Sequence, residues 1–191
     1  DPWTNQPDKN DPVWNTLQSG DKAIYGYYEG PDNLPQRKGL LRDSKGELLP
    51  NTFFTNIKKF PSIMHQMGFK AGIYSSPGPI TCAGVAGSYG YELVDAKFFA
   101  TNGFDYLKYD WCSYGSFAKS NTTEELIKPY RIMSDALKLQ KRDIVHALCQ
   151  YGMGNVWEWG NESGGQLWRT GDDVHDTWES VRKAFKKLSD K

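Results

Sequence analysis

Apolar and polar residues recur along the chain with two different spacings, which divide much of it into short strands and longer helices. Alternating or continuous apolar runs predict strands over residues 69–74, 104–109, 143–148 and 166–169. Helical spacing predicts helices over residues 53–67, 92–101, 123–139 and 177–188, with a short helix around Val156. Strands that alternate with helices in this way are typical of β/α units and a parallel sheet.

The first fifty residues break this rhythm. They are rich in Pro, Gly, Asp and Asn, show little periodicity and are predicted as long loops. Each predicted strand ends in a polar, Gly-rich or acidic turn, and in β/α barrels the loops at the carboxyl ends of the strands form the active site. Four strands cannot close an eight-stranded barrel, and an open sheet leaves its edges exposed. We therefore expect either that part of a barrel is missing from this chain or that the edges are covered in another way.

The composition is that of an ordinary globular protein. The 191 residues suffice for one domain with a core, and the formal net charge is zero. This balance argues against a nucleic-acid partner, and no apolar run approaches the roughly 18 residues of a membrane span. An aromatic fraction of 14% fits either an aromatic core or flat rings that line a sugar pocket. The chain starts at Asp1 without Met or an apolar leader, which leaves a removed leader and a missing N-terminal portion both open.

The first segment that carries candidate chemistry is the predicted strand that runs into Asp110. Period-two alternation places Tyr106, Lys108 and Asp110 on one face. The Lys108 ammonium would keep the Asp110 carboxylate ionised, as a nucleophile requires. A surface ion pair is the alternative interpretation of the same two residues.

The second segment is an acidic cluster that lies after the last predicted strand and before the last predicted helix. Asp176 or Thr177 is a plausible N-cap for that helix, but Asp172 and Asp173 precede the cap and follow Arg169. Glycoside hydrolysis requires two carboxyl groups that face one sugar. One attacks the anomeric carbon, and the other gives a proton to the leaving oxygen and then takes one from water. Two acidic segments at strand ends could supply this pair.

Short motifs between about Arg42 and Trp178 make a family resemblance specific. In order they are Gly72-Ile73-Tyr74, Thr81-Cys82-Ala83-Gly84, Gly87-Ser88-Tyr89-Gly90, Asp95-Ala96-Lys97, Tyr106-Leu107-Lys108-Tyr109-Asp110, Cys149-Gln150 and Trp168-Arg169. With these motifs the chain resembles glycoside hydrolase family 27, the α-galactosidases and α-N-acetylgalactosaminidases. The resemblance implies an α/β fold, a partial (β/α)8 TIM barrel with about four to five β/α units. It also implies an enzyme that removes terminal α-D-galactose with retention, through a covalent glycosyl-enzyme.

The resemblance implies a role for individual residues. Asp110 would be the nucleophile, and Asp173, four residues after Arg169, would be the acid/base, with Asp172 as its competitor. A retaining mechanism would place the two carboxyl groups about 5–5.5 Å apart. The remaining implied substrate-binding residues are Asp1, Trp3, Tyr74, Cys82, Lys108, Gln150 and Arg169.

The cysteines and the N-terminal region are also interpreted through the family. Cys82 and Cys112 would form a disulfide and Cys149 would stay free, whereas three reduced core cysteines are the alternative. Asp1-Pro2-Trp3 is similar to the end of a sugar-binding Asp-Asp-x-Trp motif, and an alternative alignment places residues 25–28 there. Residues 4–41 would form a long inserted loop within a single, incomplete catalytic domain spanning 1–191.

Other functions and attributes remain open at this stage. A relative that acts on α-N-acetylgalactosaminides, β-L-arabinopyranosides or isomalto-type glucans would differ near Gln150 and Tyr151. An inactive carbohydrate-binding fragment is a further alternative. No cofactor or metal is expected, because His65, His146 and His175 lack ligand spacing. The expected partner is a carbohydrate substrate rather than nucleic acid or membrane, and assembly as a homo-oligomer is left open. Secretion or a periplasmic location follows from the resemblance.

Overall fold

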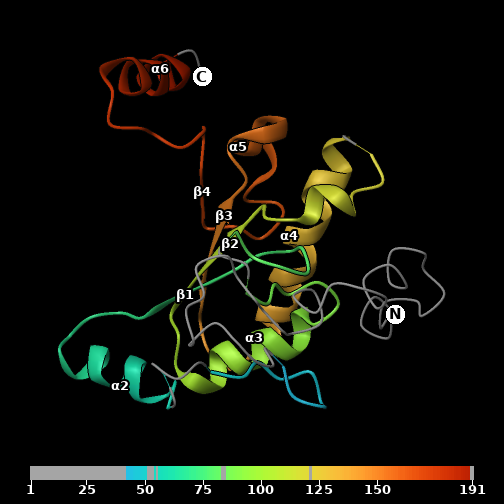
Figure 1. The fold of residues 1–191 in the computed structure, drawn as a ribbon, viewed down its shortest axis with the longest axis vertical. Coiled ribbons are helices and arrows are strands. Elements are labelled where there is room, and N and C mark those ends of the chain that lie inside the picture. The colour runs from blue at the N-terminus through green and yellow to red at the C-terminus, as the bar shows by residue number, and fades with distance from the viewer. Residues whose placement is uncertain (1–41, 51–53, 55, 83–84, 121, 190–191) are drawn as a thin grey trace, which may run out of the picture.

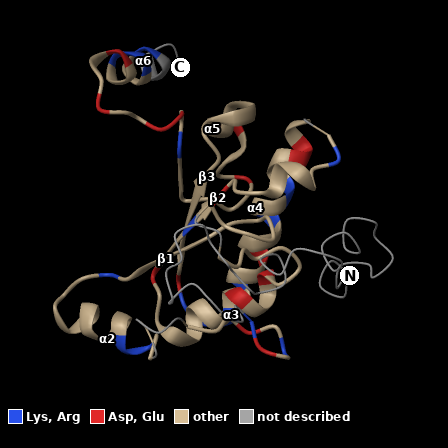
Figure 2. Ribbon diagram, in the orientation of Figure 1, with Lys and Arg blue, Asp and Glu red and all other residues tan. Residues whose placement is uncertain are grey.

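The computed structural model describes residues 42–50, 54, 56–82, 85–120 and 122–189. The predicted insertion at 4–41, both alternatives for the Asp-x-Trp motif, and the candidate residues Asp1 and Trp3 therefore lie outside the described residues. No helix in the described part is both long enough and apolar enough to cross a lipid bilayer. Lys and Arg are interspersed with Asp and Glu along the ribbon of the described residues (Figure 2).

A parallel sheet with strand order β1-β2-β3-β4 forms the centre of the molecule (Figure 1). The strands are β1 (Gly72–Ser75), β2 (Tyr106–Asp110), β3 (Val145–Cys149) and β4 (Leu167–Trp168). All three neighbouring pairs are parallel. Helical segments connect each strand to the next, so the prediction of a partial α/β barrel with about four to five β/α units is confirmed.

The helices of the described residues alternate with the strands in the predicted order, and the first of them precedes β1. They are α2 (Lys59–Gln66), α3 (Glu92–Asn102), α4 (Thr123–Lys138), α5 (Val156–Trp159) and α6 (Trp178–Ser189), with short 3-10 turns at Tyr114–Ser116 and Met153–Asn155. Gly103 ends α3 in the left-handed conformation that favours glycine. The Thr122 hydroxyl caps α4 by accepting the Glu125 N–H at 3.4 Å.

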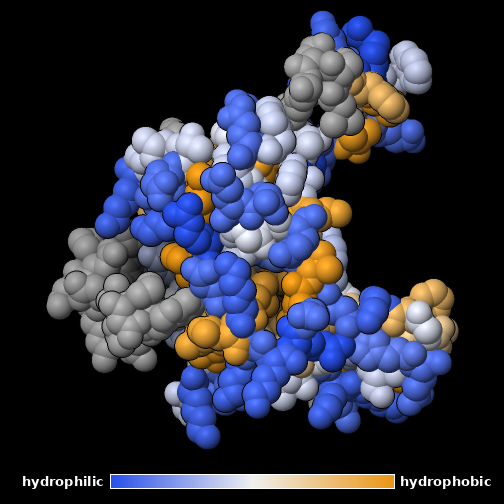
Figure 3. Space-filling view, turned by 180° about the vertical axis from the view of Figure 1, so that it is seen from behind, coloured by the Kyte–Doolittle hydropathy of each residue, from blue (hydrophilic) through white to orange (hydrophobic). Residues whose placement is uncertain are grey.

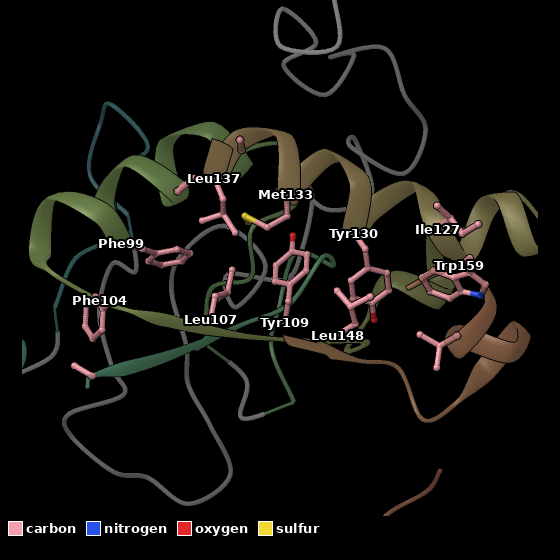
Figure 4. Close-up of a cluster of buried hydrophobic side chains, with 14 residues drawn as sticks. Phe99, Phe104, Leu107, Tyr109, Ile127, Tyr130, Met133, Leu137, Leu148 and Trp159 are labelled. Atoms are coloured by element: carbon pink, nitrogen blue, oxygen red, sulfur yellow. The ribbon is translucent and has the colours of Figure 1, made fainter. Parts of the chain in front are cut away.

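The hydrophobic core lies between the sheet and helices α3 and α4, which contact each other (Figure 4). Alternation along β2 directs Leu107 and Tyr109 into this layer, where both are fully buried. Phe99 from α3 and Tyr130 and Met133 from α4 complete the packing, also without exposed surface. Burial of each of the apolar side chains Leu107, Phe99 and Met133 stabilises the fold by about 1.5–3 kcal/mol. Tyr106, Lys108 and Asp110 consequently lie on the opposite face of β2, as predicted.

The predicted element boundaries differ from the observed ones mainly at the amino ends. The helix predicted over 53–67 begins only at Lys59, and Pro61, expected to interrupt it, lies in its first turn, where the backbone N–H has no helical partner to lose. The strand predicted over 69–74 begins at Gly72, and Phe69 remains 56% exposed. Apolar character alone does not mark where strand pairing starts.

Candidate active site

The candidate residues from different segments meet at the carboxyl edge of the sheet. The strand register pairs Tyr74 with Lys108 and Asp110 with Cys149, and β4 ends at Trp168, directly before Arg169. Because all strands are parallel, their carboxyl ends lie along the same edge, where active sites of β/α barrels are found. The topology alone thus brings together side chains that are about a hundred residues apart in sequence.

Asp110 is a buried carboxylate with a full set of donors. Its residue is only 5% exposed. Oδ2 accepts the Tyr74 hydroxyl at 2.9 Å, and Oδ1 accepts the Tyr151 hydroxyl at 3.0 Å and the Trp111 N–H at 2.8 Å. Lys108 Nζ lies 3.9 Å from Oδ2 and is partly exposed. Hydrogen bonds and a nearby cation stabilise the charged form of a buried carboxyl group.

The two phenols that contact Asp110 stay protonated at neutral pH. Burial, reinforced by the hydrogen bond to Asp110 and its negative charge, raises the pKa of Tyr74 well above its usual range. The same causes raise the pKa of Tyr151 to about 12. Both hydroxyls therefore act as donors to the carboxylate over the physiological pH range.

A disulfide between Cys82 and Cys112 joins the loop after β1 to the loop after β2, with the two Cα atoms 5.2 Å apart. The predicted pairing is confirmed, Cys149 is a buried free thiol, and the alternative of three reduced cysteines is wrong. Cys112 Sγ also lies 3.2 Å from the Tyr74 hydroxyl. The side chains of Cys82, Asp110 and Cys112 are close enough to share a metal ion, but the bonded sulfurs offer no thiolate to hold one.

Asp173 lies on the segment between β4 and α6 and is in contact with solvent. Its Oδ1 accepts Arg169 Nη1 at 2.8 Å, and its side chain is 71% exposed. Arg169 is held in turn by the Gly171 carbonyl, at 3.1 Å from Nε. Of the two predicted N-caps, Thr177 rather than Asp176 caps α6, because its hydroxyl accepts the Ser180 N–H at 3.3 Å.

Tyr151 connects the two acidic segments. Its hydroxyl donates to Asp110, and its ring lies under the Arg169 guanidinium with Cζ 4.7 Å from the ring centroid. Arg169 in turn holds Asp173, so a continuous set of contacts joins the two candidate carboxyl groups. From the sequence, Tyr151 was predicted only to lie near the sugar 2-position. Its contact with Asp110 could have been expected from its place two residues after the end of β3, the strand that pairs with β2.

Gln150 is almost completely buried beside this cluster. Its Oε1 accepts the Met153 N–H at 2.7 Å, but its Nε2 finds no partner among the described residues. Buried amide donors are nearly always paired, so an unpaired one calls for an explanation such as a missing water or ligand.

A family model described as alpha galactosidase A matches residues 23–191 of the chain. The chain belongs to the alpha galactosidase A family. Alpha-galactosidase 3 of Arabidopsis thaliana is 42% identical over 144 residues, which cover 74% of this chain and 31% of that protein. The matched part of this chain spans between 30% and 43% of the length of curated alpha-galactosidases that it is similar to.

Two solved structures of the same kind are similar in fold. Alpha-galactosidase I from Mortierella vinacea aligns with a TM-score of 0.66 and 36% identity over 71% of this chain and 34% of that chain. The alpha-galactosidase from Saccharomyces cerevisiae with raffinose aligns with a TM-score of 0.65 and 37% identity, over 71% of this chain and 30% of that chain.

Proposed function

We propose that this chain carries the catalytic carboxyl groups of a retaining α-galactosidase, with Asp110 as the nucleophile and Asp173 as the acid/base. The observation that supports this most directly is the contrast between the two acids in one network. Asp110 is buried and accepts three hydrogen bonds, whereas Asp173 is exposed and held by a single arginine. A nucleophile must stay ionised, while an acid/base must exchange protons with solvent.

The reaction proceeds in two steps. In the first, Asp110 attacks the anomeric carbon of a terminal α-galactoside, the glycosidic bond breaks, and Asp173 gives its proton to the departing oxygen. In the second, Asp173 takes a proton from a water molecule, which displaces Asp110 from the anomeric carbon and releases galactose. Two inversions at one carbon give net retention.

The substrate is a terminal α-D-galactose on an oligosaccharide or glycoconjugate. The names of the relatives support this class, and one structural relative carries raffinose. Tyr74, Lys108, Gln150 and Arg169 would contact the sugar. The unpaired Gln150 amide could donate to a hydroxyl group, which favours galactose over an N-acetylated sugar. Substrate contacts by Cys82, Asp1 and Trp3 also remain proposals.

An oxidising compartment fits the Cys82–Cys112 disulfide, because such bonds persist mainly in secreted and periplasmic proteins. We accordingly place the protein outside the cytosol.

The decisive experiment compares hydrolysis of aryl α-galactosides by the wild-type protein, Asp110→Ala and Asp173→Ala. We expect Asp110→Ala to lower kcat by about 10⁴-fold or more, as removal of a catalytic nucleophile does. Asp173→Ala should retain activity on substrates with good leaving groups, and azide should rescue it because a small anion needs no general base. The first sugar product should have the α configuration by NMR.

The control is Asp135→Ala, which removes a surface carboxyl group on α4 that pairs with Lys138. Near-normal turnover by Asp110→Ala would exclude its role as nucleophile. A panel of aryl α-N-acetylgalactosaminides and β-L-arabinopyranosides tests the related specificities, and galactose binding by the wild-type protein without any hydrolysis would indicate a carbohydrate-binding module.

A further inference from the structure

Tyr151 occupies a backbone conformation that tyrosine seldom adopts. Its φ angle of 64° lies in the left-handed region, which is strained for a residue other than glycine. Gly152 follows with φ of 81°, and a Cβ there would collide with the Thr170 carbonyl. The turn after β3 is therefore pressed against the segment that carries Arg169. Strain of this kind persists where the surrounding structure enforces it, often at functional sites.

The side chain uses this position to make two separate contacts. Its hydroxyl donates a hydrogen bond to Asp110 Oδ1 at 3.0 Å, while the Tyr74 hydroxyl donates to the other carboxylate oxygen, Oδ2. Its ring face supports the Arg169 guanidinium, which holds Asp173. One residue thus contacts both the proposed nucleophile and the arginine that orients the proposed acid/base.

We propose that Tyr151 is a positioning residue that stabilises Asp110 as a free carboxylate and, through Arg169, keeps Asp173 in place. This inference rests on the proposed function, because it assumes that Asp110 attacks the sugar. The hydrogen bond is strongest when Asp110 is ionised and weakens when the carboxylate becomes an ester. The Tyr151 hydroxyl therefore favours departure of the sugar from the covalent intermediate.

The test removes the hydroxyl alone with Tyr151→Phe, in the full-length protein and with an aryl α-galactoside. A hydrogen bond to a charged group is typically strong enough to change an equilibrium about tenfold or more. The glycosyl-enzyme should accumulate, so kcat and KM should fall together by about tenfold while kcat/KM on its pH plateau changes little. The acidic limb of kcat/KM should move upward by about one pH unit, because a carboxylate that loses a donor binds a proton more readily.

The other titratable groups around Asp110 remain in place in this variant. They are Tyr74 on β1, Lys108 on β2, Cys149 on β3 and Tyr130 on α4. Tyr114→Phe is the matched control, because it also deletes one hydroxyl that contacts a carboxylate, Glu125 at 3.3 Å, outside the site. It should leave the pH profile and the ratio of kcat to KM unchanged.

Tyr151→Leu separates the two contacts by removing the ring as well. It should move the acidic limb as Tyr151→Phe does, and it should also lower kcat/KM several-fold because Arg169 loses its support. All variants are assayed below their own melting temperatures, so that unfolding does not contribute.

The inference is overturned if Tyr151→Phe keeps the wild-type acidic limb and kcat to KM ratio, or if it lowers kcat/KM without moving the limb. Turnover by Asp110→Ala would instead refute the proposed function itself, so the two failures are distinguishable.

Discussion

At the scale of single residues, Asp105 shows how the end of the sheet opposite the candidate site is held. It precedes β2, and its carboxylate accepts the Ala71 N–H at 2.9 Å and contacts His65 at 2.7 Å and Arg142 at 2.5 Å. Burial alone would raise the pKa of Asp105, but these donors outweigh burial and lower the pKa to about 2. In β/α barrels this end of the strands serves stability rather than catalysis.

We expect Asp105→Asn to lower the free energy of unfolding by about 2 kcal/mol at pH 6. A carboxyl group whose folded pKa is depressed stabilises the protein above its unfolded value of 3.8, and this contribution is lost as the pH falls through about 2. The difference in unfolding free energy between wild type and variant should therefore become smaller below pH 4. Urea unfolding at pH 6 and pH 2.5 measures both values.

Asp135→Asn is the control for this prediction, since Asp135 forms a surface pair with Lys138 at 3.0 Å. Exposed pairs of this type contribute about 0–1 kcal/mol. The difference in unfolding free energy between wild type and Asp105→Asn could stay constant from pH 6 to pH 2.5. That result would show that the Asp105 carboxylate contributes no pH-dependent stability.

At the scale of elements, sequence spacing predicted the type and order of strands and helices well, because each depends on local periodicity. Alternation over Tyr106, Lys108 and Asp110 correctly identified one face of β2. Spacing could not place Tyr151 against Asp110. That contact depends on the register between β2 and β3 and on a left-handed turn that the residue type disfavours. The disulfide was available only from the family resemblance, since three cysteines allow several pairings.

The disulfide is an element-scale constraint with a measurable contribution to stability. Cys82 and Cys112 are 30 positions apart, so the bond removes loop-closure entropy worth about 3–4 kcal/mol from the unfolded chain. The double variant Cys82→Ser, Cys112→Ser should lose about that much unfolding free energy, together with activity. Denaturant unfolding with and without a reductant measures this effect.

Reduction should destabilise the wild-type protein to the level of the double variant and leave the double variant unchanged. This comparison separates the bond from the serine substitutions themselves. Titration of two additional thiols verifies that the bond has been reduced. If the unfolding midpoint of the wild-type protein is then unchanged, the disulfide does not stabilise the fold.

At the scale of the whole molecule, helix α6 stands apart from the sheet and its two packed helices (Figure 1). Hydrophobic side chains on this helix face solvent (Figure 3). Trp178 is 79% exposed and Phe185 is 70% exposed, although their spacing is that of an amphipathic helix. Near the opposite end of the sheet, Met67 is 62% exposed and Phe69 56% exposed. Large apolar side chains that share one exposed helix face, such as Trp178 and Phe185, are typical of a surface that packs against another part of a protein or a partner.

A polypeptide of residues 1–191 alone should therefore self-associate at micromolar concentration and bind a hydrophobic dye. Replacing Trp178 and Phe185 with Lys should shift it toward monomer, because the apolar face of α6 becomes charged. The matched control Arg182→Gln, Lys183→Gln changes the same helix at two exposed polar positions and should self-associate like the parent chain. Light scattering across a concentration series gives the oligomeric state, and a monomeric parent chain that binds no dye would mean that α6 packs its apolar side against the rest of the molecule in solution.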